Sequence, residues 1–321
     1  MNIIDLKIGM KGFFQAWSYN PRTKKRTALT DWIPNSMLEN GMNQMADFSN
    51  WAGLGSKNQV GTVSVPAPNT NDTQLLGYIA GTANIVEHTS GAQATAPFYG
   101  WDRTTYEYPA GPPIANQNLQ EAGIGWEVNN SPPALITRAL FTDELGGFPV
   151  FTPLADEVLQ VTYELRYYPP LVDVERTIIL DGITYDTITR ASAVNLWGQD
   201  IGQIMGQKSA FNSDWQAYAG NIGSITEPPD GLFAPCDNDD QFNLGYQSNS
   251  FYIDMQCNCG TTGWNLAGGI RSIRIRTNAG DFQTQFTEAD DQPNPGFTIP
   301  KDSSFTMQLV WRLSWAEFII P

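Results

Sequence analysis

The chain has one histidine, His88, and histidine is the side chain that most often acts as a general base near neutral pH. It lies in the Thr/Ser/Gly-rich segment Val86-Glu87-His88-Thr89-Ser90-Gly91. A serine–histidine–acid triad needs such a base beside a nucleophile, yet no Gly-x-Ser-x-Gly elbow accompanies it. The sequence therefore predicts an incidental surface or loop histidine, no catalytic residues and no enzymatic activity.

Metal ligands are also sparse. Cys257 and Cys259 are separated by one residue, and only Cys236 and His88 remain to complete a zinc tetrad, so we expect partly buried thiols and no metal site. Three cysteines in a predicted reducing compartment do not favour a disulfide framework.

An acidic run, Asp237-Asn238-Asp239-Asp240-Gln241, begins like a calcium loop. Its sixth position is Phe242 instead of glycine and its twelfth is Ser248 instead of glutamate, so a solvated acidic loop is preferred to an irregular calcium site. The sequence contains no glycine-rich phosphate loop, and no cofactor is predicted.

Aromatic side chains are the remaining functional signal. Trp101, Tyr106 and Tyr108 lie in a segment whose alternation predicts a strand with one aromatic face. That face can pack inside a sandwich, fill a subunit interface or stack on a sugar. Trp264 lies in a Gly- and Asn-rich stretch, 257–269, which we interpret as an inserted recognition loop.

The charge balance excludes several classes of partner. The formal net charge is -15 at pH 7, which argues against nucleic-acid binding because phosphate affinity depends on Lys and Arg. No run of about 18 apolar residues exists, so no membrane insertion is expected. The N-terminal segment lacks the pattern of a secretory signal, so we expect synthesis and assembly in a cytoplasm.

The elements that must position these residues are mainly strands. Alternating or apolar runs bounded by turn residues predict strands over 12–19, 135–141, 159–168, 177–180, 183–188, 270–277 and 305–315. Asp181-Gly182 predicts a two-residue hairpin turn. Short helices are predicted only over Ser36 to Asp47, capped by Asn35 or Ser36, and over Leu196 to Met205.

Five short blocks recur in the same order in the two halves. Examples are Ser49-Asn50-Trp51 with Ser213-Asp214-Trp215, Val60-Gly61-Thr62-Val63 with Ile222-Gly223-Ser224-Ile225, and Leu76-Gly77-Tyr78 with Leu244-Gly245-Tyr246. We interpret them as a duplication. The predicted fold is all-β, with two tandem related β-sandwich domains of jelly-roll or immunoglobulin-like layout, residues 1–170 and 171–321, and one or two short helices.

Four further blocks carry a resemblance to a known family. They are Pro97-Phe98-Tyr99-Gly100-Trp101-Asp102-Arg103-Thr104-Thr105-Tyr106, Asn118-Leu119-Gln120-Glu121-Ala122-Gly123-Ile124-Gly125-Trp126, Thr137-Arg138-Ala139-Leu140-Phe141, and 154–166, Leu-Ala-Asp-Glu-Val-Leu-Gln-Val-Thr-Tyr-Glu-Leu-Arg. Together they resemble virion structural proteins of tailed bacteriophages, described as tail-fibre, collar or neck components.

This resemblance implies assembly or attachment instead of chemistry. We expect a trimeric fibre or collar protein on the neck or tail of the virion, with itself and other neck, collar or tail proteins as partners. Residues 1–170 would be the copy that anchors it to the particle. The alternative is a receptor-binding module that recognises a host surface glycan through Trp101 or Trp264.

Overall fold

The structure is a computed structural model and describes residues 3–45, 55–62, 66–128, 131–141, 151–197, 214–236, 241–243, 246–277, 279–288, 298–304 and 306–319. These residues form a nearly all-β protein with a sandwich-like layout, as predicted. Its described helical elements are the six-residue α1 (Glu39–Gln44) and a 3-10 turn, η1 (Val194–Leu196).

The chain forms two compact units, and each is assembled from separate stretches of sequence. Unit 1 comprises Met1–Gly9, Gly91–Gly100 and Tyr167–Ala316, and unit 2 comprises Met10–Ser90, Trp101–Arg166 and Glu317–Pro321. The chain passes from unit 2 to unit 1 near the predicted boundary at residue 170. The units nevertheless differ from the continuous stretches 1–170 and 171–321, because the first nine residues belong with the C-terminal half.

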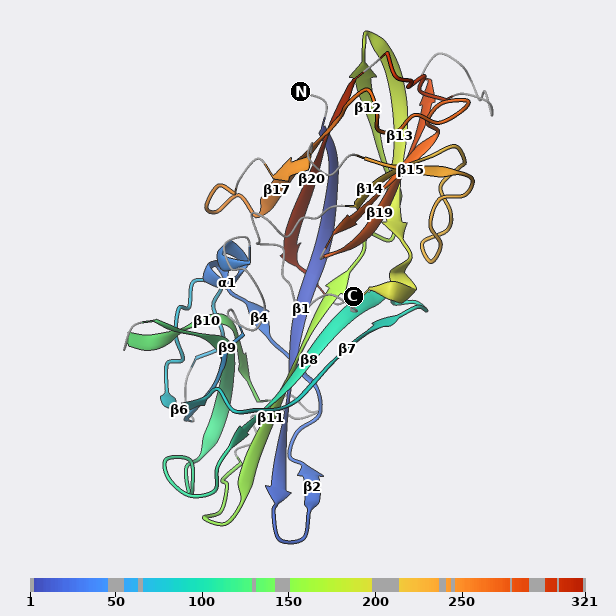
Figure 1. Cartoon of the computed structure of the whole chain (residues 1–321). Helices are drawn as coiled ribbons and strands as arrows, with labels where there is room; N and C mark the ends of the chain where they lie inside the picture. The colour runs from blue at the N-terminus through green and yellow to red at the C-terminus, as the bar shows by residue number, and fades with distance from the viewer. Residues whose placement is uncertain are drawn as a thin grey trace. The chain divides into compact units, whose positions relative to one another are not determined.

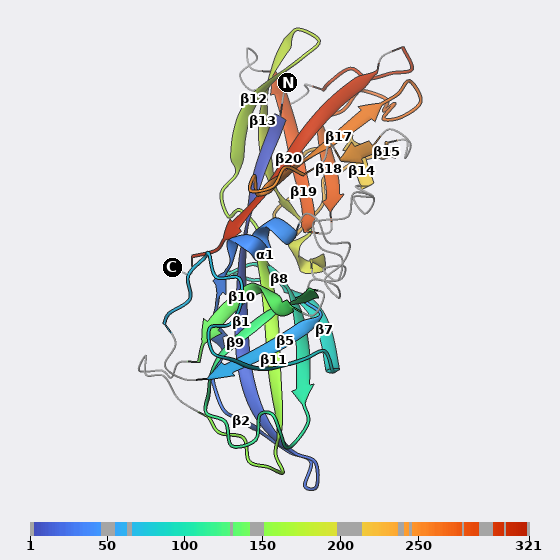
Figure 2. The ribbon, with the colours of Figure 1, turned by 90° about the vertical axis from the view of Figure 1, so that its left-hand side faces the viewer.

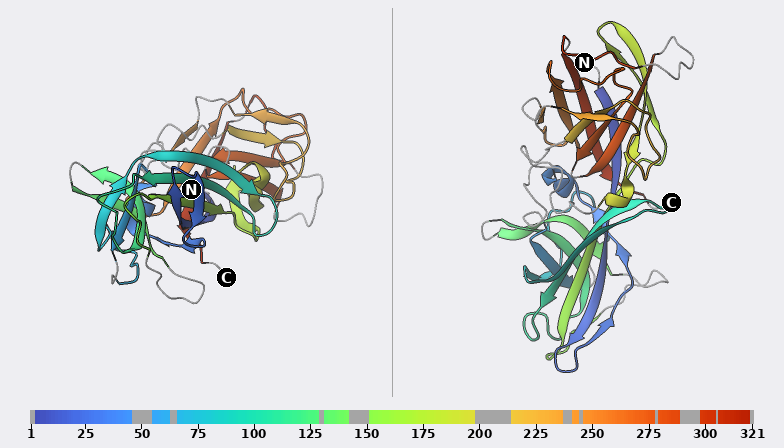
Figure 3. Two further views of the ribbon diagram at one scale, coloured as in Figure 1. Left: turned by 90° about the horizontal axis from the view of Figure 1, so that it is seen from below. Right: turned by 45° about the vertical axis from the view of Figure 1, so that its right-hand side comes forward.

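Unit 2 contains two facing sheets. The first has the order β4-β10-β9-β5-β6, with bounds Ser36–Met37, Ser131–Leu140, Leu119–Val128, Lys57–Thr62 and Tyr78–Thr82. Figure 2 labels its three central strands, β10, β9 and β5. The second is the part of a nine-stranded sheet that has the order β1-β11-β8-β7, with bounds Ile3–Asn20, Val158–Tyr168, Tyr99–Tyr108 and Ile85–Gln93 (Figure 3). The short strands β2 (Lys25–Ala28) and β3 (Ile33–Pro34) also pair with β1 (Figure 1).

Tyrosine side chains connect the two sheets of unit 2. The Tyr108 hydroxyl, fully enclosed, donates to the carbonyl oxygen of Asn58 over 2.9 Å, and the Tyr106 hydroxyl donates to the carbonyl oxygen of Gly55. Tyr163 packs on Phe14 with ring centroids 5.0 Å apart. The core between the sheets is therefore both apolar and hydrogen-bonded, which is what a buried tyrosine hydroxyl requires.

Unit 1 also has two sheets. One has the order β16-β17-β20 followed by the first part of β1, with bounds Gln241–Asn243, Tyr252–Cys259 and Met307–Glu317. The other has the order β12-β13-β19-β18-β14-β15, with bounds Val174–Leu180, Ile183–Ser192, Gly280–Glu288, Ser272–Thr277, Asp214–Tyr218 and Phe233–Pro235. Trp215, Trp311 and Phe282 form its aromatic core, with Trp215 and Trp311 centroids 6.4 Å apart.

Local signals predicted the hairpin correctly and the helices only in part. Leu180 pairs with Ile183 across Asp181 and Gly182, whose φ angles are 49° and 80°. The helix predicted from Ser36 begins only at Glu39, because Ser36 pairs in β4. Asn35 caps no helix, since its side-chain oxygen accepts the backbone N–H of Gly12 at 3.1 Å. Most of the second predicted helix lies outside the described residues.

The proposed duplication stays a prediction, and two of its block pairs differ in secondary structure. Val60 to Thr62 lie in β5, whereas Ile222 to Ile225 lie in a loop. Tyr78 opens β6, whereas Tyr246 lies outside any strand. The final strands of the two halves agree better, because β11 and β20 both contain eleven residues and bury most of their apolar side chains.

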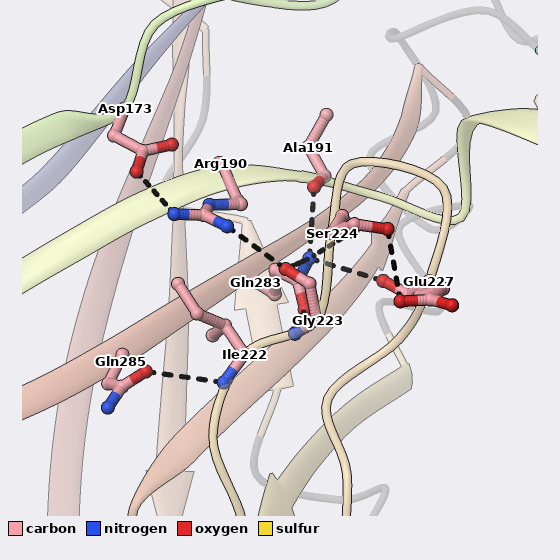
Figure 4. Close-up of polar contacts among 9 residues, drawn as sticks. All are labelled: Asp173, Arg190, Ala191, Ile222, Gly223, Ser224, Glu227, Gln283 and Gln285. Atoms are coloured by element: carbon pink, nitrogen blue, oxygen red, sulfur yellow. Dashed lines mark hydrogen bonds and ion pairs between the residues drawn. The ribbon is translucent and has the colours of Figure 1, made fainter.

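The loop that contains Ile222 to Ile225 is held in place within unit 1 by a buried glutamine, Gln283 of β19 (Figure 4). The Gln283 side-chain nitrogen lies 2.9–3.2 Å from four carbonyl oxygens, those of Ala191, Gly223, Ser224 and Glu227. Its side-chain oxygen accepts the Gly223 N–H at 2.9 Å. One fully buried amide therefore donates to carbonyl oxygens of the loop and of β13, and it also accepts a backbone N–H of the loop.

A buried ion pair fixes the first sheet of unit 2. Arg138 on β10 and Glu121 on β9 are both fully enclosed, and the Arg138 Nε donates to Glu121 over 2.9 Å. The other guanidinium nitrogens donate to Asp72 at 2.8 Å and to the carbonyl oxygen of Pro66 at 2.9 Å. Glu121 also accepts the backbone N–H of Gly77 at 2.6 Å. The pair therefore holds parts of the loop between β5 and β6 against the sheet.

We predict that Arg138→Met lowers the free energy of unfolding by about 3–5 kcal/mol, because it leaves the Glu121 carboxylate buried without its cation. Adding Glu121→Gln should recover part of that loss, so the two effects are not additive. Urea denaturation of the full chain measures both. Arg22→Met, at an exposed turn, is the control and should change the value by at most about 0.5 kcal/mol. Strict additivity of the double variant would contradict this assignment.

Candidate functional site

The aromatic residues predicted on one strand separate onto two faces of β8. Tyr106 and Tyr108 point into the core and are almost fully buried, so the expectation that they are exposed for partner or sugar contact is corrected. Of the alternatives for them, packing inside the sandwich is the one observed. Trp101 lies an odd number of positions from both tyrosines, so its side chain points to the outer face of the strand. There it is half-buried.

Trp264 is also buried, which corrects its interpretation as an exposed sugar platform. Only 1% of its surface is exposed, and its ring centroid lies 6.2 Å from that of Trp215. The residue adopts φ 56° in the loop that follows β17, so the loop turns its large side chain inward. The loop is anchored by this indole and does not present it to a ligand.

The outer face of β8 carries an arginine, Arg103, that contacts two tryptophans. The Arg103 guanidinium carbon lies 4.8 Å from the Trp101 ring centroid and 5.1 Å from that of Trp32. Its Nε donates to Glu164 of β11 over 2.7 Å. Glu164 is only 1% exposed and also accepts from Arg166 at 2.5 Å, so one buried carboxylate orients two arginines.

The same face extends to the strands at its side. Arg26 of β2 stacks over Trp17 of β1, with 4.2 Å between guanidinium carbon and ring centroid. It also donates to the hydroxyl of Thr162 at 3.2 Å, and Thr162 in turn contacts Thr105. We call this surface the arginine–tryptophan face; its members are Trp17, Trp32, Trp101, Arg26, Arg103 and Glu164.

This face is suited to binding and not to proton transfer. About 38% of the Arg103 side chain and 33% of the Arg26 side chain remain exposed, and the three tryptophans are half-buried. Partly exposed tryptophan and arginine are the residue types that contribute most to binding energy at interfaces. Because Glu164 and the indoles already hold the guanidinium groups, less side-chain entropy is lost on binding.

His88 lies in strand β7 and not in a loop, so of the predicted alternatives, a surface or a loop histidine, the surface position is the one observed. Its Nε2 lies 2.8 Å from Asp102 Oδ2, and half of its side chain is exposed. Asp102 is buried, and its Oδ1 has no hydrogen-bond partner among the described residues. None of the contacts among the described residues brings a nucleophile to His88. His88 and Asp102 therefore form a histidine–aspartate dyad without a third member among these residues.

Unit 1 contains a cavity of about 640 Å³ beside the β12–β13 hairpin. Its charged lining groups are Asp181, at the hairpin turn, and the buried Lys301. The Lys301 ammonium donates to the side-chain oxygen of Asn265 and to the carbonyl oxygen of Asp302, both at 3.0 Å. These contacts tie the loop before β20 to the loop after β17.

Within the described part of the chain, no group of three His, Cys, Asp or Glu side chains is placed to hold a metal. Residues 237–240, the core of the acidic run weighed as a calcium loop, lie outside the described residues. None of the described helices has the length and apolar character needed to cross a membrane. Comparisons with family models, curated proteins and solved structures gave no match.

Sequence reasoning found Trp101 and missed the residues around it. The available signal was Glu164, a carboxylate between Tyr163 and Leu165 in an apolar strand, where a charge is tolerated only with a partner. Alternation places Glu164 on the face of the strand opposite Tyr163 and Leu165, and nothing in the sequence indicated that Arg103 and Arg166 cover it.

Burial raises the pKa of the Asp102 carboxyl above its ordinary value of 3.8, and this outweighs the lowering by the charge and hydrogen bond of His88. The folded chain therefore binds this proton more tightly than the unfolded chain does. The tighter binding of this proton contributes fully to the free energy of unfolding below about pH 3.8. That contribution is lost as the pH rises through the raised pKa of Asp102.

We therefore predict that the free energy of unfolding of the Asp102→Asn variant rises, relative to that of the original chain, as the pH rises from about 4 to about 7. Urea denaturation at several pH values measures the difference in free energy of unfolding. Asp31→Asn, at an exposed position, is the matched control against which the difference for Asp102→Asn is compared. A pH-independent difference for Asp102→Asn would contradict the prediction.

Proposed function

We propose that this protein is a non-catalytic structural component of a tailed-bacteriophage virion, a homo-oligomeric fibre or collar protein attached to the neck or tail. A trimer is the oligomer that we expect, with other neck, collar or tail proteins as further partners. The assignment to a phage particle rests on the resemblance of the four sequence blocks. The assignment to an assembly role is supported by the surface chemistry of unit 2.

The observation that carries the assembly role is the arginine–tryptophan face. It presents indoles together with the guanidinium groups of Arg26 and Arg103, the second of which is oriented by the buried Glu164 carboxylate, in a chain whose formal net charge is -15. The chain as a whole is acidic, but this one sheet face concentrates arginine and tryptophan. The surface chemistry of the face therefore differs from that of the chain as a whole. Such a face fits an acidic protein partner, including another copy of this chain.

Two exposed sheet edges give independent support. β7 lies at the end of its sheet in unit 2, and Ile85 and Val86 are each 46% exposed. β12 lies at the end of its sheet in unit 1, with Ile179 53% exposed. Edge strands that expose apolar side chains are templates for pairing with a further chain, so assembly would cover them.

Substitution of Trp101 tests the assembly role. We expect Trp101→Ala to weaken self-association of the full chain by roughly tenfold to a hundredfold, the range for loss of an interface tryptophan, while the Arg103 to Glu164 bond keeps the fold. Native mass spectrometry and light scattering across a concentration series measure the oligomer. Tyr78→Ala, an exposed aromatic on a different sheet, is the matched control.

A chain that stays monomeric at every concentration and is absent from purified virions would overturn the proposal. If Trp101→Ala leaves the oligomer unchanged, the proposal of self-assembly stands, but the arginine–tryptophan face is not part of the interface. Mass spectrometry of purified particles reports directly whether the chain is a virion component.

A glycan-binding module is the second candidate function. Two half-buried indoles, Trp32 and Trp101, lie on either side of Arg103, and aromatic faces can stack on a sugar ring while the arginine donates to its hydroxyl groups. The face therefore suits a host surface glycan as well as a protein. Trp264 is not part of this candidate site, because it is buried.

Glycan-array binding distinguishes the two candidates. If the face binds glycan, Trp32→Ala and Trp101→Ala should each abolish the array signal, whereas Tyr78→Ala should retain it. The absence of any signal for the intact oligomer would count against the glycan candidate and leave the assembly role in place.

A further inference from the structure

Two cysteines that are 21 residues apart meet inside unit 1. The Sγ atoms of Cys236 and Cys257 lie 2.7 Å apart, and both residues are buried. All three cysteines of the chain are thiols in this structure. The contact is thus a thiol pair held within the core.

The pair connects the two sheets of unit 1. Cys236 directly follows β15, the edge strand of the six-stranded sheet, and its N–H donates to the carbonyl oxygen of Trp215 at 2.8 Å. Cys257 lies in β17 of the other sheet, between Gln241 of β16 and Leu309 of β20. Backbone pairing on both sides therefore fixes the positions of the two thiols.

We propose that Cys236 and Cys257 form a disulfide bond that joins the two sheets of unit 1 when the chain meets an oxidant. A sulfur–sulfur bond measures about 2.0 Å, so the two sulfur atoms need to approach by only about 0.7 Å, which is within reach of small side-chain rotations. The inference stands on this contact alone and does not rest on the proposed function.

A small-molecule disulfide such as oxidised glutathione is a sufficient oxidant. The thiolate of one cysteine attacks it, forms a mixed disulfide and releases one glutathione thiolate; the second cysteine then displaces the other. The protein loses two electrons and two protons, and two molecules of reduced glutathione form. Because both thiols are buried, the reaction proceeds during folding or through transient opening of unit 1.

Cys259 provides an internal test of the pairing. It lies two residues beyond Cys257 on β17, so its side chain projects from the same side of the strand, and it is also buried. The Sγ atom of Cys236 lies 2.7 Å from that of Cys257, and this is the pair that we propose to oxidise. Oxidation should therefore leave Cys259 as the one remaining thiol.

The experiment folds the full chain with oxidised glutathione or with a reducing agent, and then alkylates the remaining thiols in denaturant. We expect three alkylated cysteines after reduction and one, Cys259, after oxidation, with a Cys236 to Cys257 peptide in non-reducing mass spectrometry. The oxidised chain should melt roughly 5–10 °C higher than the reduced chain, because the bridge restricts the unfolded state.

Single variants separate this pairing from the alternatives. Cys259→Ser should keep the shift in melting temperature, and Cys236→Ser and Cys257→Ser should each lose it. Three alkylatable thiols after oxidative folding, or a dominant peptide that links Cys259, would overturn the proposal. The peptide map of the unaltered chain decides the question even if a variant fails to fold.

Discussion

The requirement that a charge inside a β-sandwich must be fully satisfied by protein groups governs unit 2. Arg138 and Glu121 lie on adjacent strands without contact to solvent, and the guanidinium also reaches Asp72 and the Pro66 carbonyl oxygen. Removing either partner leaves a buried charge, so the loop between β5 and β6 and the two strands depend on one another. This interdependence favours one register of β9 against β10 over its alternatives, because a slip of one residue would turn Arg138 to the other face.

The same principle produces the binding surface. Glu164 lies in β11 with 1% exposure, and the two arginines that neutralise it extend over its outer face. Those arginines are partly exposed and stack on aromatic rings, so a group that stabilises the fold also orients a surface for a partner. The four blocks of sequence on which the proposed family rests contribute Arg103, Glu121, Arg138 and Glu164. They therefore include both partners of the Arg103–Glu164 and Arg138–Glu121 ion pairs.

The core of unit 1 is built around uncharged aromatic groups. Its centre is a set of aromatic rings around Trp215 and Trp311, and the loop beside it is held by the amide of Gln283. A buried amide costs less to desolvate than a buried charge and can serve backbone donors and acceptors at once. The two units thus share strand content and final-strand length while differing in what stabilises them, and the block pairs at Val60 and Ile222 occupy different structures.

The sequence by itself determined the all-β class, the hairpin at Asp181-Gly182 and the strand positions around 159–168, because alternation and turn chemistry are local. It could not determine that Tyr106, Tyr108 and Trp264 are buried while Trp101 is half-exposed, since the face of a strand that meets a second sheet depends on distant residues. It also could not place the first nine residues with the C-terminal half or bring Cys236 against Cys257. Those contacts join segments that are far apart in the chain, and only tertiary packing decides which of many equally apolar segments meet.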